Sequence, residues 1–368
     1  MIENVIDTTE YCRHCLMCRH VAPVGNVTSR ETVTPHGVAQ LVASERRDMI
    51  EWDGDTVDAL YSFSDNGNSR AHCVTNQPLG EALAAARARV VEQEKAPEVV
   101  YEVGEKFRRW ENPYEPVAPD APTGEPTGQD EVALFVGDEA AYLHPSTLDA
   151  ALALLEEVGI EPALVGRGRN NGVLASSLGL ADRARDLAQA TLKELEESGA
   201  TTLLVLSPGD YFAFGQLYEE RLGMEVPEAV DLVELTELLA QKLDDGALEV
   251  SRDGEGGPYA YVDPTHAVRV PSHFEPARHV AEAVFAEGSR VELFRREGRA
   301  YPSGNLALQF THPDLADRLT KSRLKDARSA EATQVTTVGA GSLYHLKQHA
   351  SSFNVAVEGL YEAAADRG

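Results

Sequence analysis

Three of the four cysteines of this 368-residue chain lie within seven residues, at positions 12, 15 and 18. The C-x₂-C-x₂-C spacing places three thiolates on one tight loop, where they can face a common centre. Iron–sulfur clusters are held by cysteine thiolates in runs of this kind. The loop therefore indicates a 4Fe–4S cluster, with the distant Cys73 as the candidate for the fourth ligand.

The spacing around Cys73 supports this interpretation. In the ferredoxin run C-x₂-C-x₂-C-x₃-C-P, the fourth cysteine binds the other cluster of a two-cluster fold. Here that fourth position is Ala22, followed by the expected Pro23. Counting back from Cys73 at the same spacing gives a second run whose own three ligands are missing. The four positions without cysteine are the ligand positions of one cluster: Ala22, Phe63, Asn66 and Ser69. The four cysteines present are the complete ligand set of the other cluster: Cys12, Cys15, Cys18 and Cys73. The prediction is one 4Fe–4S cluster with these four cysteines as iron ligands.

Two alternatives remain open for the cysteines: a zinc knot, or four unrelated thiols. Structural zinc sites usually take cysteines as two C-x₂-C pairs, so three in a row at this spacing are unusual for zinc. A c-type haem is excluded because neither C-x-x-C is followed by histidine.

Net charge, hydropathy and cysteine usage indicate which classes of protein this chain can belong to. The formal net charge of −27 argues against nucleic-acid binding, because phosphates would be repelled. No apolar stretch is long enough for a membrane span, and the N-terminus is unlike a signal peptide. Cysteines clustered as ligands suit a reducing compartment, so we expect a cytoplasmic protein.

The chain divides by pattern into four parts. We expect a helical, ferredoxin-like cluster module at 1–95 and a proline-rich linker at 96–130. Short apolar strands then alternate with amphipathic helices, which predicts parallel sheets in two α/β pseudo-repeats, 131–250 and 256–368, facing each other across a cleft. The fold class is therefore α+β overall. Strands are predicted at 132–136, 162–165, 202–206, 259–262, 291–294 and 335–338, and helices at 145–158, 180–198, 235–243, 279–286 and 313–327.

Four segments resemble the iron–sulfur subunit family of glycolate oxidase, anaerobic glycerol-3-phosphate dehydrogenase and heterodisulfide reductase, the CCG-domain proteins. Residues 34–37 (TPHG) and 78–83 (PLGEAL) are similar to segments that follow the family's two ferredoxin runs. Residues 262–266 (VDPTH) and 310–313 (FTHP) are similar to its His-Asp-Pro-Cys-His and Leu-Thr-His-Pro motifs. The resemblance covers nearly the whole chain and implies the same module followed by two repeats.

The chain departs from this family at the cysteines of both repeats. Family members carry a Cys-Cys-Gly motif and further cysteines there, and this chain has none, so no thiolate-held cluster is expected in the repeats. In the first repeat the positions are occupied by Asp138, Asn170, Asn171, Ser207 and Asp210, and in the second by Thr265, Tyr301, Pro302, Gly339 and Ser342.

The resemblance implies an electron-transfer subunit of an oxidoreductase complex, without catalytic residues of its own. Its cluster would relay electrons from a flavoprotein dehydrogenase or demethylase, which carries the FAD or FMN, to an acceptor such as electron-transfer flavoprotein. Two alternatives stay open: a structural or assembly subunit whose cluster staples the N-terminal module, and an enzyme that uses the remodelled cleft.

Other polar residues are weaker candidates. Basic side chains in the cysteine loop would raise the cluster potential, or form a solvated edge that faces an acidic partner (Arg13, His14, Arg19 and His20). His266 and His312 are expected near element ends, where each could line the cleft. Asp138, Asn170, Asn171 and Asp210 are expected to converge, either as a polar pocket or hard-metal site or as neutral replacements of lost ligands, which we favour.

Overall fold

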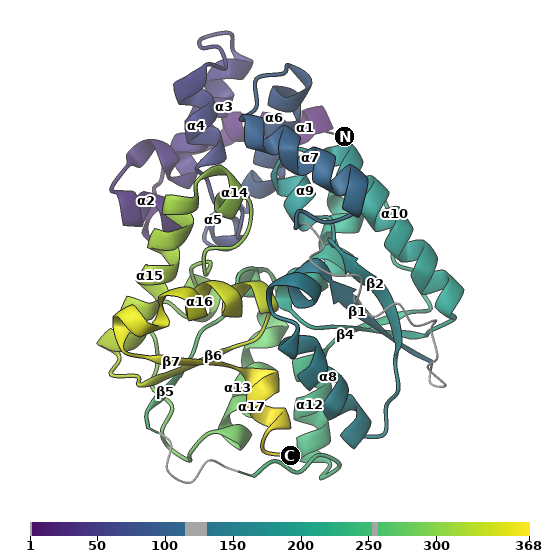
Figure 1. Ribbon diagram of the computed structural model, residues 1–368. Helices are drawn as coiled ribbons and strands as arrows, with labels where there is room; N and C mark the ends of the chain where they lie inside the picture. Colours follow the sequence, from purple (N-terminus) through teal and green to yellow (C-terminus); the bar gives the residue numbers. More distant parts are fainter. Residues whose placement is uncertain (1, 115–130, 252–256) are drawn as a thin grey trace.

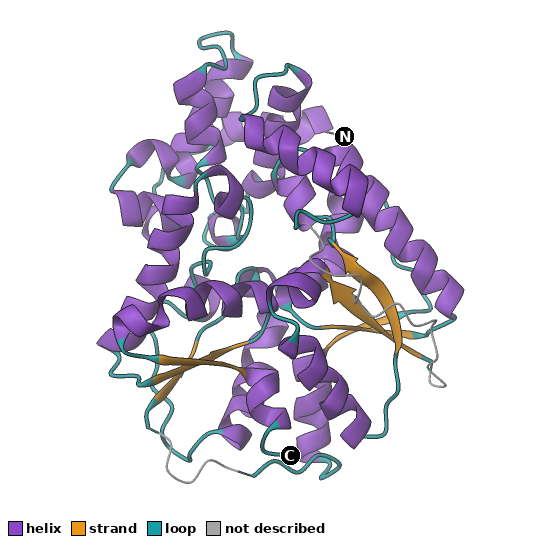
Figure 2. Ribbon diagram, viewed as in Figure 1, coloured by secondary structure: helices purple, strands orange, loops and turns teal. Residues whose placement is uncertain are grey.

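A computed structural model of the chain describes residues 2–114, 131–251 and 257–368 (Figure 1). A helical region comes first, and two separate sheets follow it (Figure 2). The expected order of a helical module and two parallel α/β units is confirmed at this level. No helix in the described ranges is long and apolar enough to cross a bilayer.

The N-terminal region is built from short helices with clear start signals. The Thr34 side chain accepts a hydrogen bond from the Gly37 backbone N–H, and Pro35 occupies the first position of its helix. Asp53 and Thr56 form a reciprocal capping box at the next helix. The helices are α1 (Ile2–Asp7), α2 (Pro23–Thr28), α3 (Pro35–Arg46), α4 (Gly54–Tyr61), α5 (Asn68–Ala71), α6 (Leu79–Glu92) and α7 (Glu98–Trp110).

Helix α7 corrects the expected start of the linker. The proline-rich stretch led us to place a linker at 96–130, but residues 98–110 form an amphipathic helix that buries Val100, Val103 and Phe107. Residues 115–130 lie outside the described residues.

The first sheet is parallel throughout, with strand order β2-β1-β3-β4. The interior strand β1 is an apolar run that is buried on both faces, as parallel strands between helix layers usually are. Its strands are β1 (Val132–Gly137), β2 (Ala163–Arg169), β3 (Thr202–Val205) and β4 (Asp231–Glu234), and its helices are α8 (Ser146–Glu157), α9 (Val173–Ser177), α10 (Ala181–Ser198), α11 (Pro208–Phe212) and α12 (Leu235–Asp244).

The second sheet is also parallel, with strand order β5-β6-β7. Its strands are β5 (Tyr259–Tyr261), β6 (Gln334–Thr337) and β7 (Ala356–Gly359), and its helices are α13 (Phe274–Val284), α14 (Leu308–Thr311), α15 (Pro313–Ser329), α16 (Ala340–Phe353) and α17 (Leu360–Ala365).

The strand predicted at 291–294 is wrong. Only an isolated parallel bridge forms there, between Tyr259 and Arg290. The backbone N–H of Arg295 bonds instead to the Asp326 carboxylate, and Leu293 packs into the core, so the apolar pattern reflects burial rather than strand pairing. The bridge at Arg290 nevertheless lies on the outer side of β5, where the first sheet has β2 on the outer side of β1. With the bridge counted, the two sheets have the same strand order.

The two repeats interlock through reciprocal helix packing. Helix α8, which follows the first strand of one repeat, packs against the last helix of the other, α17. Helices α12 and α13 make the equivalent contact in the opposite sense, and one apolar cluster joins all four helices to both sheets (Figure 1). These two reciprocal helix contacts are what a pseudo-two-fold axis between the repeats would produce. They place the C-terminal ends of the strands of both sheets around a shared cleft.

A buried carboxylate ties the helical module to both repeats. Asp65, which is 5% exposed, accepts hydrogen bonds from Arg221 of the first repeat (2.9 Å) and from Arg269 of the second. Burial opposes ionisation of Asp65, but the two arginines outweigh it and hold the pKa of this carboxyl well below its usual range. The ionised carboxylate of Asp65 thus pairs with one arginine from each of the two repeats.

Replacing Asp65 by alanine should strongly destabilise the fold. Breaking a buried ion pair leaves poorly compensated charge in the interior, at a cost of about 3–5 kcal/mol. Here two arginines lose their hydrogen-bonded carboxylate and keep the more distant Glu81, at 3.8 and 3.9 Å. The free energy of unfolding from urea titration measures this loss. The matched control is Glu105→Ala, since Glu105 pairs with Arg108 on the exposed surface and its removal should change little. Equal stability of the two variants would contradict this role of Asp65.

Candidate functional site

All four cysteines line one surface pocket, although Cys73 is far from the others in sequence. The pocket wall is completed by residues of α3, by Ser69 and by the start of α6, among them Pro35, His36, Ala39 and Leu79. Asn68 links the two cysteine segments, since its side-chain amide donates to the carbonyl of Val21 (3.1 Å), and it also donates to that of Ala300 in the second repeat (2.9 Å). The segment of Cys73 therefore lies beside the loop of the other three cysteines.

The loop that carries Cys12, Cys15 and Cys18 has an unusual backbone. His14 and Leu16, on either side of Cys15, adopt positive φ angles of 51° and 61°. Such conformations are uncommon for residues other than glycine and cluster at functional sites, where the surrounding structure holds them. They turn the loop sharply enough for all three thiols to line the same pocket.

The thiols interact electrostatically. Burial, followed by the repulsion of a Cys12 thiolate, raises the pKa of the Cys18 thiol to about 11, and Cys73 and Cys15 act in the same direction. Burial also acts to raise the pKa of Cys73, but hydrogen bonds from Thr75 and from neighbouring backbone N–H groups lower it overall. A nearby positive charge would favour the thiolate form of Cys18. In the parts of the chain that the structure describes, no three histidine, cysteine or acidic side chains converge as ligands of one metal ion.

The positions where a second cluster would bind are filled. Ala22, Phe63, Asn66 and Ser69 are all buried, and Phe63 belongs to the main apolar core. Of the basic residues in the loop, Arg19 pairs with Glu31 (3.0 Å), and the His14 ring contacts Gln40.

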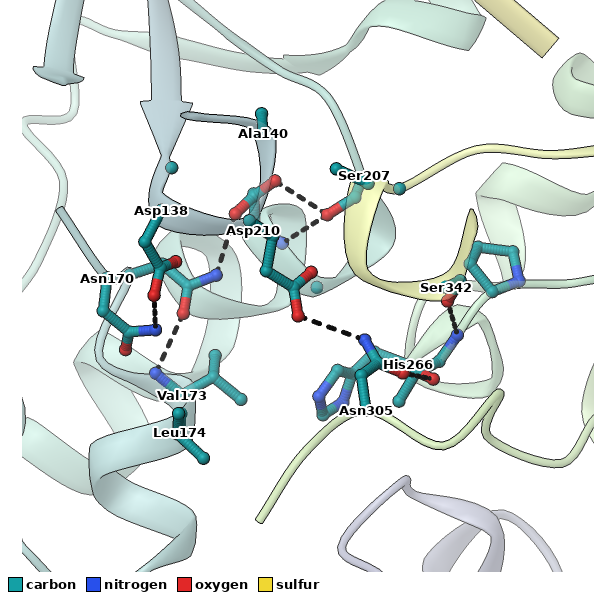
Figure 3. A pocket seen from close by; sticks show the side chains of 18 of the residues that line it. Asp138, Ala140, Asn170, Val173, Leu174, Ser207, Asp210, His266, Asn305 and Ser342 are labelled. Atoms are coloured by element: carbon teal, nitrogen blue, oxygen red, sulfur yellow. Dashed lines mark hydrogen bonds between the residues drawn. The ribbon is translucent and has the colours of Figure 1, made fainter. Parts of the chain in front are cut away.

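A second pocket lies between the repeats, where the C-terminal ends of β1, β2, β3, β5 and β6 meet. It holds the polar residues that we expected to converge. Asn170 donates to Asp138 (2.9 Å), and Asp210 accepts from Asn171 (2.8 Å) and from the Ser207 hydroxyl (2.7 Å) (Figure 3). Thr265, Gly339 and Ser342 of the second repeat also line it, whereas Tyr301 and Pro302 do not.

Three carboxyls share this second pocket: Asp138 is buried, and Glu139 and Asp210 are partly buried. Burial, and then the adjacent Glu139, raise the pKa of Asp138 to about 8. Burial, with repulsion from Asp210, raises that of Glu139 to about 7, and burial raises that of Asp210 to about 6. Such perturbed acids in a cleft are typical of binding and catalytic sites.

The sequence did not single out Glu139, Tyr114, Asn305 or Gln309, all of which line the cleft. Glu139 sits against the start of α16, where a β-carbon on Gly341 would overlap its carboxylate, and Asn305 donates to it (3.3 Å). Only the position of Glu139, three residues after the end of the strand predicted at 132–136, offered a signal.

The two candidate histidines behave differently. His266 lines the cleft, as expected for a residue at a strand end. His312, which precedes α15, does not line the cleft. Its Nε2 lies 3.1 Å from the carboxylate of Asp58 in α4, and this contact joins the second repeat to the helical module. The expectation that His312 lines the cleft is therefore wrong.

No protein-family model matches the chain. A comparison with curated proteins finds similarity to one subunit of the dihydromethanophenazine:CoB–CoM heterodisulfide reductase of Methanosarcina barkeri (strain Fusaro / DSM 804), with 25% identity over 213 residues. The chain is distantly related to this protein. The match covers 55% of the chain and 50% of the relative, so the chain spans about half the length of the curated protein that it matches. The resemblance drawn from the motifs is confirmed to that extent.

Removing the Asp138 carboxyl should change how stability depends on pH. The unfolded side chain loses its proton near pH 4, whereas the folded one keeps it to about pH 8, so folding takes up a proton between these values. The contribution of Asp138 to stability should therefore fall as pH rises from 4 to 8, and Asp138→Asn should remove this contribution, which changes the slope of stability against pH by up to about 1.4 kcal/mol per pH unit.

Denaturant titrations at pH 5 and pH 8 measure this difference. Glu156→Gln, a change at an exposed acid of α8, is the control and should leave the wild-type slope unchanged. A slope unaffected by Asp138→Asn would show that this carboxyl ionises normally in the fold.

Proposed function

We propose that this chain is an electron-transfer subunit of an oxidoreductase complex and that it holds one 4Fe–4S cluster through Cys12, Cys15, Cys18 and Cys73. The observation that supports the proposal is that four cysteines from two distant segments line one pocket. A cubane cluster needs one external ligand per iron, and four cysteines provide that number. Held in this way, the cluster supplies one-electron transfer and leaves no iron position open to substrate.

The surroundings of the pocket support docking of a redox partner. Large apolar side chains are exposed around the cysteines: Tyr11 is 73% exposed, Val74 66%, Met17 50% and Leu16 47%. Exposed apolar groups gathered around one pocket are typical of interaction surfaces. The basic side chains of Arg13 and Arg19 lie on the same loop of a strongly acidic chain, so a partner with an acidic rim fits best.

The partner proposed from the family resemblance is a flavoprotein dehydrogenase, which would carry out the substrate chemistry on its FAD or FMN. The distant relation to a protein of a heterodisulfide reductase supports a place in an oxidoreductase complex. Heterodisulfide reduction itself is not part of the proposal, because the repeats of this chain contain no cysteine.

Cluster content tests the ligand set. Anaerobically purified protein should contain about four irons and four sulfides per chain, and its reduced form should give a single cubane signal in paramagnetic resonance. Cys73→Ser should lose the cubane or convert it to a three-iron form. Ser69→Ala, which alters the same pocket at a position that is not a ligand, should retain it. Stoichiometric zinc, or an intact cubane in Cys73→Ser, would refute the crossed-ligand arrangement.

Reconstitution tests the electron relay. When the chain is mixed with the flavoprotein that co-purifies with it and with that protein's substrate, visible absorbance should bleach and then recover on addition of an oxidant. Without the flavoprotein, substrate should cause no bleaching. Met17→Glu should slow the transfer several-fold while iron content stays constant, because it places a negative charge on the docking surface. A cluster that the flavoprotein never reduces would favour the alternative role of a folding staple.

A further inference from the structure

The cleft between the repeats has the composition of a binding site for a positively charged molecule. Its cavity measures about 70 Å³ and opens to solvent on one side, which is room for a ligand of only a few heavy atoms. Among the described residues that line it are three carboxyls, Asp138, Glu139 and Asp210, and neither a lysine nor an arginine. The cleft therefore groups three acids with no lysine or arginine among its lining residues to balance their charge when they ionise.

His266 supplies an independent sign of a missing partner. Its side chain is 5% exposed and lines the cavity, yet neither ring nitrogen has a hydrogen-bond partner in the described part of the chain (Figure 3). A buried polar group left unpaired costs about 1–3 kcal/mol. The ring is held in place by stacking on Phe212, with 5.3 Å between ring centroids, and the backbone of His266 adopts a positive φ of 74°. The fold thus keeps the imidazole of His266 here despite two energetic costs: its ring nitrogens lack hydrogen-bond partners among the residues that the structure describes, and its backbone has a positive φ.

The His266 ring stays neutral, so it adds no positive charge to the cavity. Burial, and then the nearby Arg269, lower its pKa to about 3. A neutral imidazole offers one N–H donor and one acceptor nitrogen. The carboxyls also retain free acceptor positions, since Asp138 accepts only one side-chain bond, from Asn170, and a carboxylate has about four acceptor sites.

We propose that this cleft binds a small organic cation rich in N–H groups, a primary ammonium or guanidinium compound, between Asp138, Asp210 and His266. An ammonium offers three N–H donors and a guanidinium five, which match the carboxylate oxygens and the acceptor nitrogen of His266. A quaternary ammonium has the charge but no N–H, and it would leave these acceptors unpaired. This site goes beyond the electron relay and does not depend on it.

Binding should release protons and should tighten as pH rises. The titratable groups that face the cavity are Tyr114 after α7, Asp138 and Glu139 after β1, Asp210 in α11 and His266 after β5, with Glu234 acting on Asp210. A bound cation favours the ionised carboxyls, so protons held near pH 7 leave on binding. Affinity should therefore increase between pH 6 and pH 9, where an alkylammonium itself remains charged.

Titration calorimetry on the full-length protein at high ionic strength tests the proposal. Ethylammonium and methylguanidinium chlorides are the probes, and tetramethylammonium and magnesium chlorides are the comparisons. One equivalent of either probe should bind, with a heat that depends on the ionisation enthalpy of the buffer, and tetramethylammonium should bind at least tenfold more weakly. No binding of either probe, equal binding of tetramethylammonium, or binding of magnesium alone would each overturn the proposal.

Variants locate the binding. Asp210→Asn and His266→Phe should each weaken the probe at least tenfold, while Glu237→Gln, at an exposed acid of α12, should not change its affinity. An equal loss in the Glu237 variant would mean that the cation binds to diffuse surface charge, contrary to the proposal. If a cleft variant does not fold, the buffer-dependent heat and the tetramethylammonium comparison on the wild-type protein still decide the outcome. Because the cysteine pocket is not involved, iron content should not change in any of these variants.

Discussion

Pairing of the buried Asp65 with two arginines is the constraint on which the relative placement of the parts depends. A charge in the interior must be compensated, and each arginine comes from a different repeat. Arg269 also covers the ring of Phe212, with its guanidinium 4.3 Å from the ring centroid, and Phe212 in turn supports His266 on the cleft wall. The same network therefore braces the cysteine-bearing module and one side of the cleft.

The cleft shows what becomes of a strand-end site when thiols are absent. A fold that had merely lost its ligands could fill the space with apolar side chains, at no electrostatic cost. Here one buried and two partly buried carboxyls remain close together, and loss of solvation raises their pKa values and disfavours their charged forms. This cost argues against our expectation of neutral replacement at Asp138 and Asp210, and it points to a cavity that retains polar groups for use.

The two sites are chemically separate. The cysteine pocket lies at an exposed surface with apolar side chains around it, and this suits electron transfer to a docked protein. The cleft lies between the repeats, and its polar groups are oxygen and nitrogen atoms, which prefer protons and hard cations to soft metals. The helical module and the repeats can therefore serve different purposes in one chain.

The sequence by itself determined the features that depend on neighbouring residues: the cysteine spacing, the apolar strands β1 and β5, and the long helices α10 and α15. It also predicted that Asp138, Asn170 and Asp210 would converge, because parallel strands place their C-terminal ends at one edge of a sheet. Only the tertiary structure decided that residues 291–294 form no strand, that His312 pairs with Asp58, and that Glu139 and Asn305 complete the cleft. These outcomes depend on contacts between segments far apart in the chain, and local periodicity carries no information about which distant group will satisfy a backbone N–H or a charge.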